Sequence, residues 1–281
     1  MLLPRFLTAL VGAPLLLLAI WWGQVPFFVL MFGVTMLALQ EYYDLAQEAA
    51  WPVSKGIGLV LGALFYLLIA LLGTGMFGIG QEKFSSSAQW FLPIFISFQT
   101  IFLAVFLLLN RQNKQQAFLN FALTFLGLFY VVWTLSHLVL VRDLRPDGMQ
   151  YTFFLFGIIW VLDIGAYFGG KKFGKHPLSS ISPKKTWEGT IVGSALALVA
   201  AFILRSLILR EYPVHQILIL AIVVIGLAQL SDLSESLFKR NVGVKDSGQL
   251  LPGHGGILDR FDSFLLTVPV YYYMLVCYIH K

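Results

Sequence analysis

Four long stretches without a charged side chain constrain the fold of this chain more than any other feature. They run from Phe6 to Gln40, from Gly56 to Gln81, from Phe84 to Asn110 and from Gln115 to Val141. An α-helix crosses the hydrocarbon core of a bilayer with about 20 predominantly apolar residues, and each stretch is at least that long. Charged residues make up only 12% of the chain, against about 25% in a soluble domain. The sequence therefore predicts a polytopic helical membrane protein.

The apolar segments predict an all-α fold with about nine transmembrane helices and no separate soluble domain. The longest interval between them is about 25 residues, too short to fold alone. The predicted spans lie at about 6–22, 25–44, 56–79, 90–109, 117–141, 151–170, 189–209, 214–236 and 261–279. We assign residues 1–150 to N-terminal helices with a packing, dimer or lipid-access role. Residues 151–281 form the predicted catalytic region, with two polar loops.

The distribution of lysine and arginine predicts the orientation of these helices. With the N-terminus in the cytoplasm, 13 of the 19 Lys and Arg residues fall on the cytoplasmic side. Cytoplasmic loops of membrane proteins carry such an excess. We therefore expect the N-terminus inside and the C-terminus outside. The loops at 171–188 and 237–260 then lie on the same, cytoplasmic face.

Residues 236–262, the first polar segment, concentrate the groups that phosphate chemistry requires. Cations can neutralise phosphate charge, and glycines let backbone N–H groups approach phosphate oxygens. A basic loop that only touches anionic lipid would explain the lysines, but it would explain neither the three aspartates nor the histidine between glycines. The histidine suits a base, a phosphate donor or a structural hydrogen bond. The residues concerned are Lys239, Arg240, Gly243, Lys245, Asp246, Gly248, Gly253, His254, Gly255, Gly256, Asp259, Arg260 and Asp262.

Carboxylates at the ends of apolar segments indicate a metal ion bound with phosphate. Asp232 and Glu235 stand near the end of one span, and Asp259 and Asp262 open the next at a spacing that shares a helix face. Such carboxylates are costly in a membrane and usually face a polar cavity or a partner. Mg²⁺ takes one or two carboxylates together with phosphate oxygens. The alternative is a structural ion pair, for instance of Asp259 or Asp262 with Arg260 or Lys239.

Residues 163–188, the second polar segment, supply further candidates. Asp163 lies inside an apolar span and is a functional candidate for that reason. Gly165, Ala166, Gly169 and Gly170 indicate a close-packed helix face, or a break that lines a cavity. Hydroxyl and lysine side chains suited to phosphate follow, namely Ser179, Ser180, Ser182, Lys184, Lys185 and Thr186. The N-terminal half offers less, since Glu41, Asp44 and Glu48 read as a solvated helix end.

The two polar segments resemble phosphatidate cytidylyltransferases, also called CDP-diacylglycerol synthases. The pattern S-x-F-K-R-x₄-K-D-x-G-x₂-L-P-x-H-G-G-I-x-D-R-F-D covers residues 236–262, and S-P-K-K-T-W-E-G at 182–189 follows Asp163 as it does in that family. The first 150 residues resemble the family only in being hydrophobic spans. The resemblance implies that CTP and phosphatidate react to CDP-diacylglycerol and pyrophosphate with Mg²⁺. It also implies a multi-span homodimer in the inner membrane, with a polar cavity open to the cytoplasm.

The resemblance makes Asp232 and Asp259 the metal-binding carboxylates and allows K⁺ beside Mg²⁺, and we expect Asp246 to be a further ligand. We expect the cations Lys239, Arg240, Lys245 and Arg260 to hold the triphosphate and the leaving group. Lipid phosphate or part of the nucleotide is expected to bind Ser182, Lys184, Lys185 and Thr186, with Asp163 as a contact to substrate or metal. His254, Gly255 and Gly256 are expected to contact substrate.

Other functions remain to be distinguished from this one. A CTP-dependent polyprenol kinase would share the phosphate chemistry but transfer the γ-phosphoryl group and release CDP. A transporter also uses buried carboxylates, but here the charges gather at one face. A lipid-phosphate phosphatase would need water as its nucleophile. Nucleic acid is not an expected partner.

Overall fold

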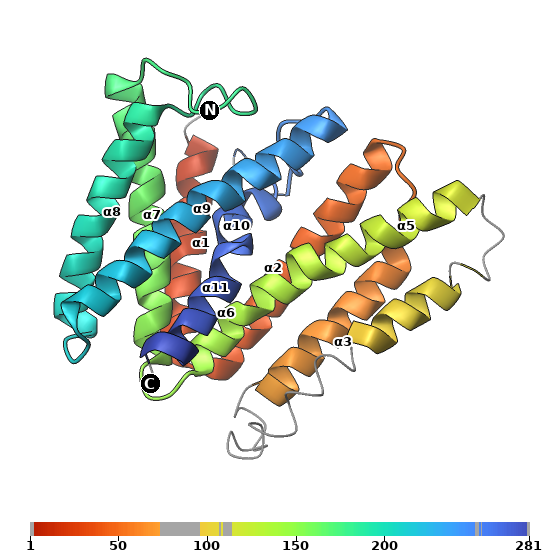
Figure 1. The fold of residues 1–281 in the computed structure, drawn as a ribbon, viewed down its shortest axis with the longest axis horizontal. Coiled ribbons are helices and arrows are strands. Elements are labelled where there is room, and N and C mark those ends of the chain that lie inside the picture. Colours follow the sequence, from red (N-terminus) through yellow and green to blue (C-terminus); the bar gives the residue numbers. More distant parts are fainter. Residues whose placement is uncertain are drawn as a thin grey trace. The chain divides into compact units, whose positions relative to one another are not determined.

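The computed structural model describes residues 3–73, 96–106, 108, 114–250, 253 and 255–279. The helices are α1 (Leu3–Trp22), α2 (Gln24–Glu48), α3 (Lys55–Gly73), Ile96–Phe106, α5 (Lys114–Gly127), α6 (Thr134–Asp143), α7 (Gly148–Phe173), α8 (Trp187–Ile208), α9 (Val214–Val242), α10 (Leu258–Leu265) and α11 (Thr267–Met274). Two π-helical segments, η2 (Leu128–Trp133) and η3 (Leu275–Ile279), continue α5 and α11. These ranges contain no strand, and the predicted all-α class is confirmed (Figure 1).

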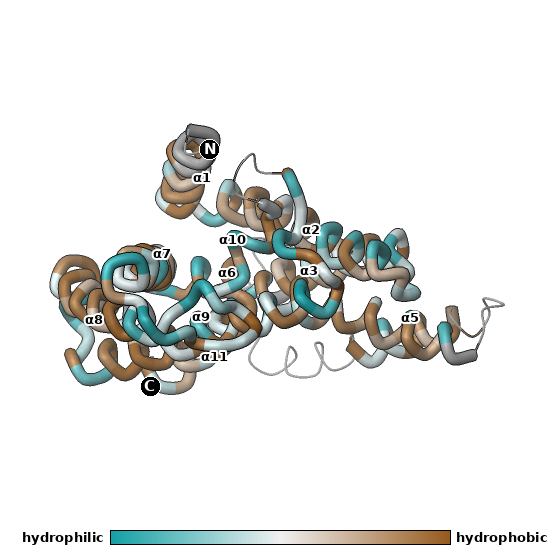
Figure 2. Tube along the Cα trace, turned by 90° about the horizontal axis from the view of Figure 1, so that it is seen from above, coloured by the Kyte–Doolittle hydropathy of each residue, from teal (hydrophilic) through white to brown (hydrophobic). Residues whose placement is uncertain are grey.

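Several of these helices are long and apolar enough to cross a membrane. In the described part of the chain five meet this criterion, and the bent pair Leu258–Leu265 and Thr267–Ile279 makes six when counted as one span. Hydrophobic residues predominate along the helices, and hydrophilic residues gather in the connections and at helix ends (Figure 2). The chain is a membrane protein, while the predicted number of about nine spans stays a prediction.

The chain divides into two compact units. The first unit comprises Met1–Asp143 and Val242–Phe261, and the second comprises Leu144–Asn241 and Asp262–Lys281. Most of the first polar segment therefore folds with the N-terminal helices. The proposed division of roles between residues 1–150 and 151–281 stays a prediction.

α2 is central to the first unit, where it packs against α1, α3 and α6. Its buried side chains include Tyr42 and Tyr43. The hydroxyl of Tyr43 donates to the carbonyl oxygen of Thr124 at 2.8 Å, so that polar group is satisfied within the apolar core. Tyr43 lies where a Cβ on Gly58 would fall, and the glycine therefore lets α3 approach the tyrosine ring. This packing fixes the C-terminal half of α2.

α7 and α8 form the closest helix pair in the second unit (Figure 1). A Cβ added to Gly165 would lie 2.9 Å from the Cα of Gly193, and one added to Gly189 would lie 2.6 Å from the carbonyl oxygen of Ala166. Small residues allow helix backbones to approach this closely. The predicted close-packed face is confirmed, and α7 continues through these glycines without a break.

The last predicted span, 261–279, corresponds to two helices. The structure has α10 and α11, with a bend of 41° between them. Pro269 lacks the N–H that would bond to the carbonyl group of Leu265, and its ring disfavours a continuous helix there. Ser231 on α9 accepts from the N–H of Leu266 at 3.0 Å and donates to the carbonyl oxygen of Asp262. The backbone groups at the break are therefore bonded to a buried hydroxyl group.

Candidate functional site

The first polar segment begins as a helix. α9 reaches Val242, so the expectation of a loop from residue 237 is wrong for its first six residues. Lys239 lies one turn after Glu235, and its Nζ is 2.6 Å from Glu235 Oε2. The Glu235 side chain is fully buried and that of Lys239 is 10% exposed. Each charged group has the other as its partner in place of water, so both can be buried. The helix can therefore continue past the apolar part of the sequence.

Glu41 on α2 joins the N-terminal helices to the first polar segment. Its carboxylate accepts hydrogen bonds from Ser247 Oγ at 2.9 Å, from Ile257 N at 2.9 Å and from Leu258 N at 2.8 Å. Glu41 is only 8% exposed. The expectation that Glu41 belongs to a solvated helix end is therefore wrong, whereas Glu48 is exposed as expected. Asp44 forms an ion pair with Lys55.

Asp259 lies in the first turn of α10, and its side chain folds back onto the connection between α9 and α10. Its Oδ2 accepts from the N–H groups of Ser247 and Gly256, both at 2.8 Å. Hydrogen bonds from backbone N–H groups stabilise the ionised form of a carboxyl group. Asp259 is 8% exposed, and these bonds fix its direction. Its position therefore depends on the shape of the loop.

Two glycines let the loop close around these carboxylates. A Cβ on Gly256 would overlap Glu41 Oε2 and Ser247 Oγ, and one on Gly255 would overlap Asp259 Oδ2. Gly255 also has a φ of +79°, a conformation that L side chains rarely adopt. Both glycines were predicted to approach substrate phosphate. The structure shows that they approach the protein's own carboxylates, and their role toward substrate stays a prediction.

A second group of charges lies in the second unit. Lys185 forms an ion pair with Asp232 on α9. Asp262 lies within electrostatic range of Asp232, Glu235, Asp163 and Lys185. Lys239, a second lysine in this group, forms an ion pair with Glu235. The side chains come from α7, α9, α10 and the connection before α8.

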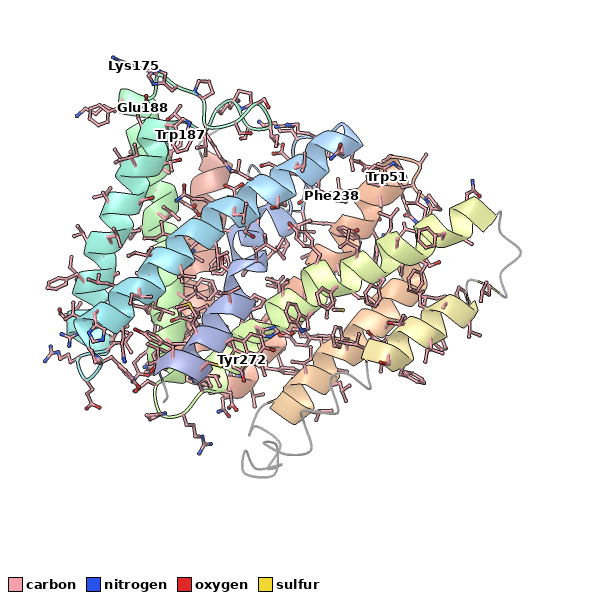
Figure 3. The ribbon with its side chains drawn as sticks, in the orientation of Figure 1. Trp51, Lys175, Trp187, Glu188, Phe238 and Tyr272 are labelled. Atoms are coloured by element: carbon pink, nitrogen blue, oxygen red, sulfur yellow. The ribbon has the colours of Figure 1, made fainter. Side chains whose placement is uncertain are left out.

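The connection between α7 and α8 is held in a defined shape. Leu178 N donates to the carbonyl oxygen of Lys185 at 2.7 Å, and Thr186 Oγ1 accepts from Gly189 N at 3.1 Å as the N-cap of α8. Glu188 accepts from Lys175 N at 3.1 Å, and the two residues lie together at this end of the helix pair (Figure 3). The loop therefore presents Lys185 to α9 from a hydrogen-bonded frame.

The two polar segments meet within the second unit. Arg240 Nε donates to the carbonyl oxygen of Ile181 at 3.4 Å, and Lys185 pairs with Asp232 on α9, just before the first polar segment. The sequence placed both segments on one face of the membrane. The contact between α9 and the 174–186 connection agrees with that placement, while the membrane side itself stays a prediction.

The remaining predicted site residues differ in their exposure. Ser182, Lys185 and Asp232 are half-buried, and His254 lies outside the described residues. Asp232 belongs to the second unit and Asp259 to the first, so their convergence on one metal ion stays a prediction. The exposed members are Asp163, Lys184, Arg240, Lys245, Asp246 and Arg260.

Glu41 is the residue that the sequence interpretation missed. It ends a run of 35 residues without charge, from Phe6 to Gln40. A carboxylate at such a position is costly unless it has a partner, so the place of Glu41 directly after an apolar run is the signal that could have indicated it. Its partners lie more than 200 residues away, which no local pattern indicates.

The carboxylates fit magnesium in their chemistry. Asp232 and Asp259 offer hard oxygen ligands beside glycines and cations that suit phosphate. Among the described residues no three His, Cys, Asp or Glu side chains form a ready metal site. A hard cation that keeps waters and takes phosphate oxygens needs only one or two carboxylates. The chemistry of each carboxylate is therefore compatible with Mg²⁺ that is bound together with a substrate phosphate.

Comparison with known proteins identifies the family. The sequence model of the cytidylyltransferase family matches residues 3–278. A phosphatidate cytidylyltransferase of Bacillus subtilis is 32% identical over 278 residues, which cover 98% of this chain and 97% of the relative. The enzyme of that name from Staphylococcus saprophyticus is 33% identical over 245 residues, covering 80% and 93%. The one from Brucella suis is 30% identical over 279 residues, covering 95% and 91%. This chain therefore belongs to the cytidylyltransferase family.

Proposed function

We propose that this chain is a phosphatidate cytidylyltransferase, which transfers the cytidylyl group of CTP to phosphatidate and yields CDP-diacylglycerol and pyrophosphate. The observation that carries the proposal is the similarity to the Bacillus subtilis enzyme over nearly the whole of both chains. The apolar helices suit a lipid substrate. The charged groups of the two polar segments suit a reaction between phosphates.

The main obstacle to this reaction is repulsion between two anions. The lipid phosphate is already an oxyanion near neutral pH, so its attack on the α-phosphorus of CTP requires no strong base. The protein has to position the two phosphates and neutralise their charge. Arg240, Lys245 and Arg260 are exposed and would bind the triphosphate and the departing pyrophosphate, while Lys239 is buried and paired with Glu235.

Asp232 and Asp259 would hold Mg²⁺, with Asp246 as a further ligand. When bound, the ion supplies positive charge that offsets the repulsion between the reacting phosphates. The bonds from Ser247 N and Gly256 N keep Asp259 in one orientation. Lys185 forms an ion pair with Asp232, so its ammonium group would also lie near a substrate phosphate bound at this carboxylate. A K⁺ ion beside Mg²⁺ belongs to the same proposal.

The orientation and assembly of the protein complete the proposal. The lysine and arginine distribution supports an active site that faces the cytoplasm, in the inner membrane, with the N-terminus inside and the C-terminus outside. A homodimer is proposed from the family resemblance. Labelling of single-cysteine variants with a membrane-impermeant thiol reagent would test the orientation.

The experiment that tests the function distinguishes transfer of the α-phosphorus of CTP from transfer of its γ-phosphorus. Purified protein in detergent micelles receives phosphatidate, Mg²⁺ and CTP labelled with ³²P at the α-phosphorus. We expect label to enter the lipid phase, with one pyrophosphate released per lipid formed. Transfer of γ-label to a lipid with release of CDP would identify a lipid kinase instead. Absence of lipid label from folded protein would contradict the proposal.

Replacing Lys184 by alanine is expected to raise a KM with little change in kcat. Lys184 is exposed on the 174–186 connection, where its charge can bind substrate phosphate before and during the reaction. Loss of such a contact should raise the KM for phosphatidate or CTP about tenfold. Lys171→Ala, at an exposed lysine near the end of α7, is the control. A lower kcat with an unchanged KM would instead make Lys184 a contact of the transition state.

A further inference from the structure

The N-terminus of α10 obtains its hydrogen-bond partners from other elements. The first N–H groups of an α-helix have no partner within the helix. Here Glu41 accepts from Ile257 N and Leu258 N, and Ser247 Oγ accepts from Asp259 N at 3.3 Å. Arg260 N donates to the carbonyl oxygen of Ile257 at 3.0 Å. All four leading N–H groups are therefore bonded, two of them to a carboxylate on α2.

Ser247 joins Glu41 to Asp259. Its hydroxyl group donates to Glu41 and accepts from Asp259 N, and its own N–H donates to Asp259 Oδ2 at 2.8 Å. Ser247 is 4% exposed. A displacement of Glu41 would thus be transmitted to the backbone and to the side chain of Asp259.

The charge of Glu41 also suits this place. A helix N-terminus carries a partial positive charge, which a carboxylate stabilises. A glutamine has only one acceptor oxygen, and in either orientation its NH₂ group would face a backbone N–H, that of Ile257 or that of Leu258. The three donors around Glu41 therefore match a carboxylate and conflict with an amide.

We propose that Glu41 is a positioning residue for the proposed cytidylyl transfer: it caps α10 from α2 and so sets the orientation of Asp259. The proposal rests on the proposed function for its catalytic part only. It gives the N-terminal helices a direct role in an active site whose charged groups otherwise come from the C-terminal half.

The test compares Glu41→Gln with Glu48→Gln, an exposed glutamate two turns further along the same helix. Hydrogen exchange in detergent micelles is followed in a peptide that covers residues 255–261, and kcat is measured with CTP and phosphatidate. We expect faster exchange and a kcat about 10²-fold lower for E41Q, since a small misplacement of a reacting group costs about that much. E48Q should match the wild type in both readouts. A general loss of folding would raise exchange throughout the chain.

A double variant tests whether Glu41 acts through the loop. Ser247→Ala removes the hydroxyl group between Glu41 and Asp259. If both residues act on Asp259 through one network, E41Q/S247A should lose little more kcat than the more impaired single variant. Loss factors that multiply would overturn the proposal, because Glu41 would then act independently of this loop.

Two results with E41Q would also overturn it, namely wild-type exchange in residues 255–261, or faster exchange with a kcat within twofold of the wild type. If E41Q does not fold, Glu41→Asp keeps the charge but withdraws the carboxylate by one methylene group, and the same outcomes apply. Inactive but folded wild-type protein would refute the proposed function. The exchange comparison would then still decide whether Glu41 holds the loop.

Discussion

Asp259→Asn is expected to abolish measurable turnover while the protein still folds. The asparagine side chain has the same shape, and its oxygen can accept the bonds that Oδ2 now accepts from Ser247 N and Gly256 N. The substitution removes the negative charge that would hold Mg²⁺ beside the reacting phosphates. Loss of one preorganised electrostatic contact typically lowers kcat by about 10²–10³-fold, and loss of a metal ligand should cost at least as much. Lipid labelling from α-labelled CTP measures the effect.

The control for this prediction is Glu211→Gln, at an exposed carboxylate between α8 and α9. It should leave turnover unchanged. The Mg²⁺ concentration that gives half-maximal activity is measured for each variant that retains activity. Near-wild-type turnover in D259N would show that the reaction does not require this carboxylate as an anion, and the metal assignment would fail.

Lys239→Met should produce the largest loss of stability. Lys239 and Glu235 form a buried pair, with the glutamate fully inaccessible to solvent. Removing one partner leaves an uncompensated buried charge, which costs about 3–5 kcal/mol. Denaturant unfolding in detergent micelles should show the decrease in the free energy of unfolding. This measurement is independent of any part that Lys239 plays in binding phosphate.

The double variant Glu235→Gln/Lys239→Met should recover most of that stability, because it removes both charges. Lys55→Met provides a comparison with a more exposed pair, since the side chains of Lys55 and Asp44 are 28% and 39% exposed. Exposed pairs contribute about 0–1 kcal/mol. A double variant as unstable as K239M, or a loss in K55M as large as in K239M, would contradict the buried-pair explanation.

The interpretation of single segments succeeded where a local pattern was sufficient. Uncharged runs predicted membrane helices because backbone groups in lipid must be bonded within the segment. Gly165 and Ala166 predicted a close-packed face, which α7 and α8 form. The bend at Leu266 could have been predicted from Pro269, since proline removes a defined helical hydrogen bond. The end of α9 at Val242 could not have been predicted, because the buried ion pair with Glu235 offsets the polarity of Lys239.

The sequence by itself determined the all-α membrane class, the two polar segments and the family, because these depend on composition and on residues that are near one another in the chain. Only the tertiary structure decided the partners of those residues. It showed that Glu41 bonds to Ile257 and Leu258, more than 200 positions away, and that Lys185 is paired with Asp232. Such pairings depend on which helices pack together. Helix packing is the sum of many weak contacts along whole surfaces, and no short stretch of sequence encodes it.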